Sequence, residues 1–175
     1  MIKESNLNFK SETLAQLIIN TAEQYKKSDR GQKSLLETLV GAGIWYLPST
    51  GLKLFNQKIS KVALQSLKDN SEGTNLVEEH GIPRKVAGRL LYTKHLEEIK
   101  KNPLIVKELY LNQFGKFNLV LKQENGNLVK HQKVDVFENE EAAYQKAKIE
   151  LVYFSDEDYQ VFKRKKRKKK PRLIN

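Results

Sequence analysis

The sequence predicts an α+β fold, and three observations carry that prediction. Apolar residues recur at three- and four-residue steps through most of the first 110 positions, which is the spacing of amphipathic helices. Two β-prone runs flank Asn125-Gly126, a dipeptide typical of a tight hairpin turn. A cationic run after Phe162 lacks apolar residues that could join a core. We therefore expect an N-terminal helical part, a strand-turn-helix, a β-hairpin with flanking helices, and a basic C-terminal tail.

Composition favours one folded domain and excludes several classes of site. The 175 residues are 39% hydrophobic and 30% charged, which favours a single domain. We place it over residues 1–162, with a helical scaffold in 1–73 and the part that would carry any site in 74–162, followed by a tail in 163–175. No cysteine is present, which excludes disulfides, thiolate zinc sites and cysteine nucleophiles. No charged leader and no run of eighteen apolar residues occurs, so we expect a cytoplasmic protein without a membrane span.

The N-terminal part is predicted to be helical throughout. One helix should cover about residues 11–27 and a second should begin near Leu35, with glycines at 41 and 43 that could admit another backbone. A third helix should follow an N-cap at Ser49-Thr50, with an apolar stripe made of Phe55, Ile59, Val62, Ala63 and Leu67. No histidine occurs in residues 1–70. We expect a scaffold or a surface for a protein partner here, without chemistry.

The second half alternates strands, turns and helices. Leu76-Val77 predicts a strand, residues 84–101 a helix, and residues 104–114 a further helix that restarts after Asn102-Pro103. The hairpin should pair residues 117–121 with 128–137. A short helix after residue 138, a strand at 151–154 and a final helix capped by Ser155 complete the expected body.

The positive charge is concentrated at the C-terminal end. Nine of the 32 basic residues lie in ten positions, which leaves 23 basic against 21 acidic residues elsewhere. We predict that these cations bind nucleic-acid phosphates: Lys163, Arg164, Lys165, Lys166, Arg167, Lys168, Lys169, Lys170 and Arg172. A nuclear import signal and a segment that binds anionic lipid are the alternatives for the same composition.

One short motif carries the candidate chemistry. Glu79-His80-Gly81-Ile82-Pro83 follows the expected strand and resembles the first motif of the HNH, or His-Me finger, nucleases, in which an acidic residue and a histidine end a strand and a proline follows three residues later. The resemblance implies that His80 is the general base and that Glu79 binds a divalent metal such as Mg²⁺. A histidine pKa near 6.5 suits proton abstraction at neutral pH. Because neighbouring strand residues point to opposite faces, the turn would have to bring the two side chains together.

The second half of such a site is less well matched. The family's second motif places an asparagine before a histidine or asparagine on a helix, commonly between cysteine pairs that bind zinc, and those cysteines are missing here. The nearest candidates are Asn118 or Asn127, with His131 as the second metal ligand implied by the resemblance. In the predicted hairpin, however, the four-residue step from Asn127 to His131 has no helical meaning, and His131 also fits an outward strand residue.

The remaining polar residues near the motif have two readings each. Arg84 and Lys85 either clamp a phosphate beside His80 or form the exposed first turn of a helix, and His95 is expected to be solvated. The leading hypothesis is a metal-dependent endonuclease that acts on DNA or RNA, with His80 as base and the basic tail as tether. The alternative is a non-catalytic nucleic-acid-binding or scaffold protein in which His80 is structural.

Overall fold

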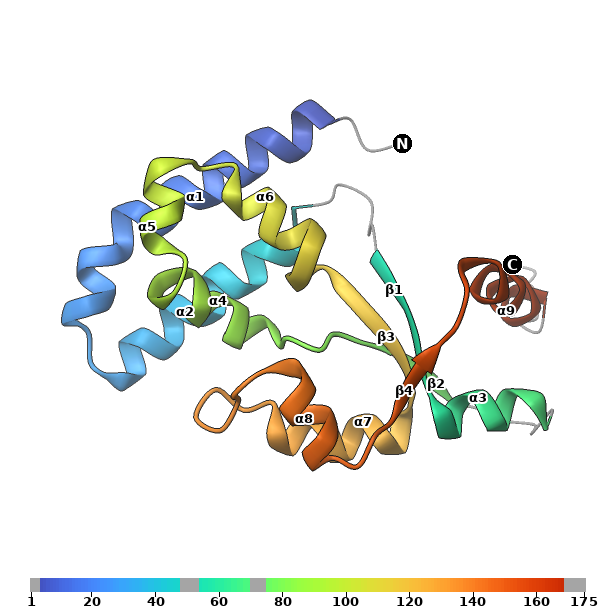
Figure 1. Ribbon diagram of the computed structural model, residues 1–175. Coiled ribbons are helices and arrows are strands. Elements are labelled where there is room, and N and C mark those ends of the chain that lie inside the picture. The colour runs from blue at the N-terminus through green and yellow to red at the C-terminus, as the bar shows by residue number, and fades with distance from the viewer. Residues whose placement is uncertain (1–3, 48–53, 70–74, 169–175) are drawn as a thin grey trace, which may run out of the picture.

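The computed structural model describes residues 4–47, 54–69 and 75–168. A layer of N-terminal and central helices adjoins a four-stranded mixed sheet, with further helices around the sheet (Figure 1). This confirms the predicted α+β class. In chain order the elements are α1 Glu4–Lys27, α2 Arg30–Trp45, β1 Leu54–Ser60, α3 Lys61–Lys68, β2 Leu76–Glu79, α4 Arg84–Thr93, α5 Leu96–Lys101, α6 Ile105–Leu109, η1 Tyr110–Phe114, β3 Lys116–Leu121, α7 Lys122–Leu128, η2 Val129–His131, α8 Glu140–Lys146, β4 Leu151–Tyr153 and α9 Asp156–Lys168. Within the described ranges, every helix is too short or too polar to cross a membrane.

The first two helices pack against α4, α5 and α6 through one apolar core. That core contains the stripe predicted for the first helix, including Leu14, Ile18 and Tyr25. The α2 helix begins earlier than predicted, because the Asp29 carboxylate accepts a hydrogen bond from the backbone N–H of Gln32 at 2.8 Å and caps it.

Two glycines let α2 and α4 approach each other at backbone distance. A Cβ at Gly41 would lie 2.1 Å from the carbonyl oxygen of Arg84, and one at Gly88 would lie 2.0 Å from that of Glu37. The predicted close approach at Gly41 is therefore confirmed, and α2 runs through the glycines to Trp45. This contact fixes the start of α4, and with it the turn after His80, against α2.

The prediction that Phe55 and Ile59 lie on the third helix is wrong, because residues 54–60 form β1 and the helix α3 begins only at Lys61. Phe55 and Ile59 stand four residues apart, a step that returns to the same face of a strand as well as of a helix. The hydroxyl of Ser60 caps α3 by accepting from the N–H of Ala63 at 3.0 Å. The cap predicted at Ser49-Thr50 lies outside the described residues.

The sheet has the order β2-β3-β1-β4, so its central pair is parallel and its two edges are antiparallel. The sheet joins the two parts expected from the sequence, since β1 lies in residues 1–73 and the other three strands lie in residues 74–162. Alternate residues of β3 face different cores: Phe117 and Leu119 join a cluster with α3 and α9, whereas Val120 joins one with α7 and α8. Asn118 lies on the same face as Val120 and pairs in register with Glu79 of β2.

The predicted helix over residues 84–101 is interrupted at Lys94-His95, which separates α4 from α5. The segment predicted as a helix over 104–114 is α6 followed by the π-helical turn η1, and Gly115 ends it. Gly115 permits this ending, because a Cβ there would lie 2.7 Å from the ring of Tyr110.

The predicted β-hairpin is wrong. Its first strand exists as β3, but residues 122–128 form α7, so Asn125-Gly126 lies inside a helix, and Val129–His131 is a single 3-10 turn. The carboxylate of Glu124 caps this helix by accepting from the N–H of Leu121 at 2.8 Å and from the hydroxyl of Ser60 at 2.5 Å. Leu128 is fully buried beside Val120. These tertiary contacts outweigh the local preference of Asn-Gly for a turn.

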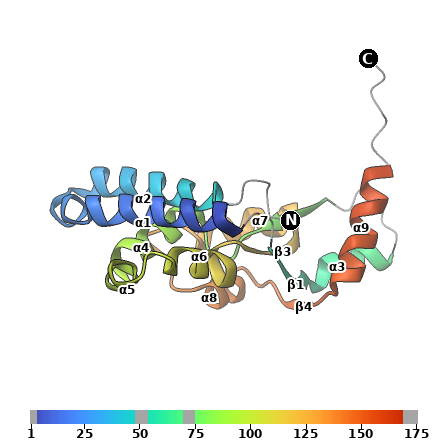
Figure 2. The same cartoon turned by 90° about the horizontal axis from the view of Figure 1, so that it is seen from above.

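The C-terminal elements follow the predictions closely. The short helix α8, the strand β4 and the final helix α9 all form, and the Ser155 hydroxyl accepts from the N–H of Asp158 at 3.1 Å as the expected cap. Tyr159 is buried against Phe55 and Phe117, and its hydroxyl donates to Glu78 at 2.7 Å. Figure 2 shows α9 at the end of the molecule away from the turn between α1 and α2, with its axis across theirs.

Candidate functional site

His80 follows β2 directly and is held by contacts on two sides. Its Nδ1 lies 2.9 Å from the carbonyl oxygen of Lys116 on β3. A carbonyl can only accept, so Nδ1 carries the proton and the neutral ring has its lone pair on Nε2. The ring of Trp45 lies edge-on at 3.7 Å between centroids and limits rotation of the imidazole. A half-buried histidine with a fixed tautomer is an arrangement suited to a general base.

Glu79 points to the other face of β2, away from His80. Its carboxylate is 5% exposed and accepts from Gln132 Nε2 at 2.5 Å and from the hydroxyl of Tyr144. Burial raises the pKa of Glu79 above its ordinary value, the nearby charge of Glu140 adds to the rise, and the two hydrogen bonds oppose it. The turn does not reverse the alternation of the strand, so the acidic residue and the histidine of the motif belong to different environments.

The hydrogen bonds around Glu79 continue from Tyr144 to Asn118. The amide of Asn118 donates to the Tyr144 hydroxyl at 2.9 Å and to Glu140 Oε1 at 3.0 Å, and its carbonyl accepts from Asn56 at 3.1 Å. Burial and the neighbouring Glu79 carboxylate raise the pKa of Tyr144, so its hydroxyl remains a donor. We call Glu79, Asn118, Gln132, Glu140 and Tyr144 the Glu79 network.

Gly81 makes room for one member of this network. A Cβ at Gly81 would lie 2.2 Å from the Glu140 carboxyl group. The glycine of the motif therefore lets α8 approach the turn, which is a packing role. The sequence did not predict this role of Gly81 or the roles of Gln132 and Tyr144. The signal that could have found the network is the face that Glu79 and Asn118 share on paired strands.

The predicted metal ligands do not come together in the described residues. His131 lies in η2, and its neighbour Gln132 makes the contact with Glu79. Within residues 4–47, 54–69 and 75–168, no group of three or more histidine and acidic side chains is placed to hold a metal. Both oxygens of Glu79 already accept hydrogen bonds. The donor set around Glu79 therefore does not fit the divalent metal that the motif implies.

His95 is buried, not solvated as predicted. It is 6% exposed, its Nδ1 lies 3.1 Å from Glu98 Oε2, and Nε2 is buried with no hydrogen-bond partner among the described residues. Its ring lies edge-on to that of Phe114 in η1, so His95 packs into the apolar core. His95 is the N-cap residue of α5.

The two cations after the turn have different surroundings. The guanidinium of Arg84 lies 4.8 Å from the centre of the Trp45 ring, a cation–π contact next to His80. Lys85 turns the other way, where its Nζ donates to the hydroxyl of Ser34 at 2.5 Å and lines a cavity between α2 and α4. Only Arg84 therefore adjoins the His80 side.

The cations predicted to bind phosphate in the tail begin on α9. Its first turn carries Asp156, Glu157 and Asp158, whose negative charges suit a helix N-terminus, and the helical backbone continues through residues 163–168. Lys169, Lys170 and Arg172 lie outside the described residues.

Comparisons of this chain with protein-family models, with characterised proteins and with solved structures find no significant match.

Proposed function

We propose that the protein binds nucleic acid through the cationic end of α9 and the residues that follow it. The observation that carries this proposal is the separation of charge along one helix. Tyr159, in the second turn, is anchored in the core by rings and a hydrogen bond. From Lys163 to Arg172 nine of ten residues are cations, while the rest of the chain is nearly neutral. An anchored helix that ends in concentrated positive charge supports binding to a polyanion.

The contacts expected from this segment are mainly with phosphates, because six of its nine cations are lysines and it contains no aromatic side chain on which bases could stack. Affinity should then depend steeply on salt. Each phosphate contact adds about 0.9 to the slope of log affinity against log salt on duplex DNA, and about 0.7 on single strands. We propose a cytoplasmic location for this activity, which the absence of cysteine suits.

The test measures binding of duplex DNA, single-stranded DNA and RNA by fluorescence anisotropy at several salt concentrations. Replacing the nine cations from Lys163 to Arg172 by glutamine should abolish most of the salt slope. A control variant with Lys26→Gln and Lys100→Gln removes exposed cations elsewhere and should bind as the wild type does. Unchanged binding by the tail variant would refute the proposal, as would binding to anionic vesicles without binding to any nucleic acid.

A second candidate function is phosphodiester hydrolysis with His80 as the general base. The specific support is the hydrogen bond from His80 Nδ1 to the Lys116 carbonyl, which leaves Nε2 as the basic nitrogen. Arg84 on Trp45 is the adjacent cation. We assign no step to a divalent metal, because Glu79 faces away from this ring.

An assay with plasmid, single-stranded DNA and RNA tests this candidate. Cleavage should fall at least about a hundredfold in His80→Ala and stay unchanged in His131→Ala, since general-base catalysis typically contributes 10²–10⁴-fold. Reactions with Mg²⁺, with Mn²⁺ and with a chelator measure any need for a metal. Cleavage that survives the His80 substitution would remove His80 from the mechanism.

The proposal includes a protein partner for the N-terminal helices, and a second copy of the chain is the occupant to test first. Large apolar side chains on α1 and α2 and directly after α2 are exposed: Phe9, Leu17, Leu35, Leu39 and Tyr46. Sedimentation velocity over a range of concentrations should show association that Leu39→Glu weakens. A monomer at all concentrations would refute self-association.

A further inference from the structure

A cavity of about 860 Å³ lies between α2, α4 and the loop after η2. Its size is in the range of small-molecule sites. Five cations from these three segments line it: Arg30, Lys33, Lys85, Arg89 and Lys133. Two of its walls, α2 and α4, belong to the helical layer, whereas α9 lies at the other end of the molecule in both views (Figures 1 and 2).

Two carboxylates also line the cavity, and both are already engaged. Asp135 lies 2.6 Å from Arg30, an ion pair between two exposed side chains at the rim. Glu37 is 6% exposed and accepts from the hydroxyl of Tyr25 at 2.8 Å. Burial and the hydrogen bond to Glu37 raise the pKa of Tyr25, so this hydroxyl remains a donor. The cavity therefore has more positive charge than its own acidic side chains balance.

The cations on the α4 wall bond to neutral acceptors. Lys85 donates to the Ser34 hydroxyl at 2.5 Å, and Arg89 donates to the carbonyl oxygens of Val134 and Phe137. Among the described residues, neither Lys85 nor Arg89 has a carboxylate at ion-pair distance. These bonds fix the positions of both cations without neutralising them.

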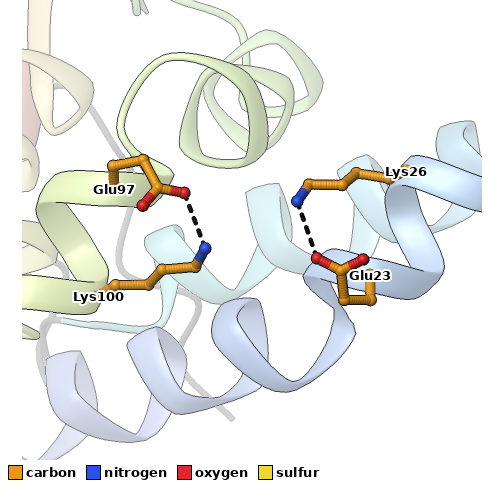
Figure 3. Close-up of polar contacts among 4 residues, drawn as sticks. All are labelled: Glu23, Lys26, Glu97 and Lys100. Carbon is orange, nitrogen blue, oxygen red and sulfur yellow. Dashed lines mark hydrogen bonds and ion pairs between the residues drawn. The ribbon is translucent and has the colours of Figure 1, made fainter.

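The face between α1 and α5 arranges its lysines differently from the cavity. There Lys26 lies 2.8 Å from Glu23 and Lys100 lies 2.7 Å from Glu97 (Figure 3). The two pairs face each other, and each lysine also helps to lower the pKa of the carboxylate in the opposite pair. Each of these two lysines therefore has a carboxylate as its partner. The cavity differs from that face, because Lys85 and Arg89 bond to neutral acceptors there. A concave surface lined by charges of one sign focuses the electrostatic potential.

We infer that this cavity binds the phosphate groups of a small anionic ligand. Several fixed donors that carry positive charge, together with the hydroxyl of Ser34, match an anion with more than one charge and several acceptor oxygens. A free nucleotide and the phosphorylated end of a nucleic-acid strand both present this chemistry. The site is separate from the cations of α9, so it goes beyond the proposed function and does not depend on it.

The decisive variant is Lys85→Gln, because Lys85 is half-buried, fixed and points into the cavity. Its control is Lys107→Gln, since Lys107 is also half-buried, is held by a hydrogen bond to Asn8 Oδ1 at 2.8 Å, and does not line the cavity. Calorimetric titration of the full chain with pyrophosphate and with a nucleoside triphosphate should give saturable binding. Loss of one charge-assisted contact should weaken it about tenfold in Lys85→Gln and less than twofold in Lys107→Gln.

A second variant is expected to bind pyrophosphate more tightly, so that a loss of binding caused by misfolding can be recognised. Asp135→Asn removes a carboxylate from the rim and should tighten pyrophosphate binding about two- to threefold, which a damaged fold would not do. The absence of saturable binding to both probes and to the phosphorylated strand described next would overturn the inference. Equal losses in Lys85→Gln and Lys107→Gln would overturn it too.

The two sources of phosphate are separated in the variant whose nine tail cations are replaced by glutamine. A strand with a 5′-phosphate that binds this variant more tightly than the same strand without it, with the difference lost on Lys85→Gln, identifies a nucleic-acid end. Binding of the nucleotide alone identifies a free ligand. Pyrophosphate binding should be the same with and without the tail cations, so failure of the tail proposal and failure of this one give different results.

Discussion

Gln132 lies between two polar regions that this protein builds in opposite ways. Its side chain donates to Glu79 in the interior, and the same residue lines the cation-rich cavity. In the Glu79 network the carboxylate and its partners satisfy one another. In the cavity, Lys85 and Arg89 bond to neutral acceptors among the described residues. A buried polar group costs free energy unless it is paired within the protein. A charged side chain that lines an open cavity is not under this constraint and can bind a ligand.

We expect the greatest loss of stability from a substitution in the Glu79 network. Glu79→Ala should destabilise the protein by about 3 kcal/mol, because Gln132 and Tyr144 each lose a buried acceptor. Glu78→Ala is the matched control: it is the neighbouring residue of β2, half-buried, with a hydrogen bond from Tyr159. We expect about 1 kcal/mol for the control in urea unfolding. Similar losses in both variants would show that the Glu79 network is no more closed than its surroundings.

An intermediate effect comes from pH. Because the pKa of Glu79 is raised in the folded protein, its contribution to stability is complete below the ordinary value of 4.5 and is lost as pH rises through the folded pKa. The wild type should lose stability relative to Glu79→Gln over that interval, by at most about 1.4 kcal/mol per pH unit.

Unfolding of both proteins between pH 4 and pH 8 measures this difference. Glu23 and Glu97, whose pKa values are lowered, are present in both proteins and cancel. A constant gap between the two stability curves would mean that the Glu79 carboxyl titrates normally.

The least change in stability is expected at the rim of the cavity. Arg30→Gln breaks the ion pair with Asp135, but both side chains are mostly exposed, so thermal unfolding should change by no more than about 0.5 kcal/mol. The same variant should alter the affinity for pyrophosphate, because it changes the charge at the rim. A large loss of stability would assign Arg30 a structural role and weaken the contrast between the two regions.

Local patterns predicted the elements whose signal was unambiguous. The stripe of α1, the strand at Leu76 and the Ser155 cap of α9 each match one local geometry alone. The pattern at Phe55 and Ile59 fits a strand and a helix equally, and the sheet decided between them through β3. The Asn125-Gly126 turn yielded to a helix because Glu124 and Leu128 find partners from distant parts of the chain.

The candidate site divides in the same way. The Glu79-His80 motif, the turn after it and the concentration of cations beyond Phe162 can be found in the sequence, because they depend on residue identity and spacing. The fold was needed to show that Glu79 faces Tyr144 while His80 faces the Lys116 carbonyl, and that Lys85 joins cations of α2 in one cavity. Strand alternation fixes opposite directions locally, but what lies in each direction is supplied by segments 36 to 65 residues away, which no local pattern encodes.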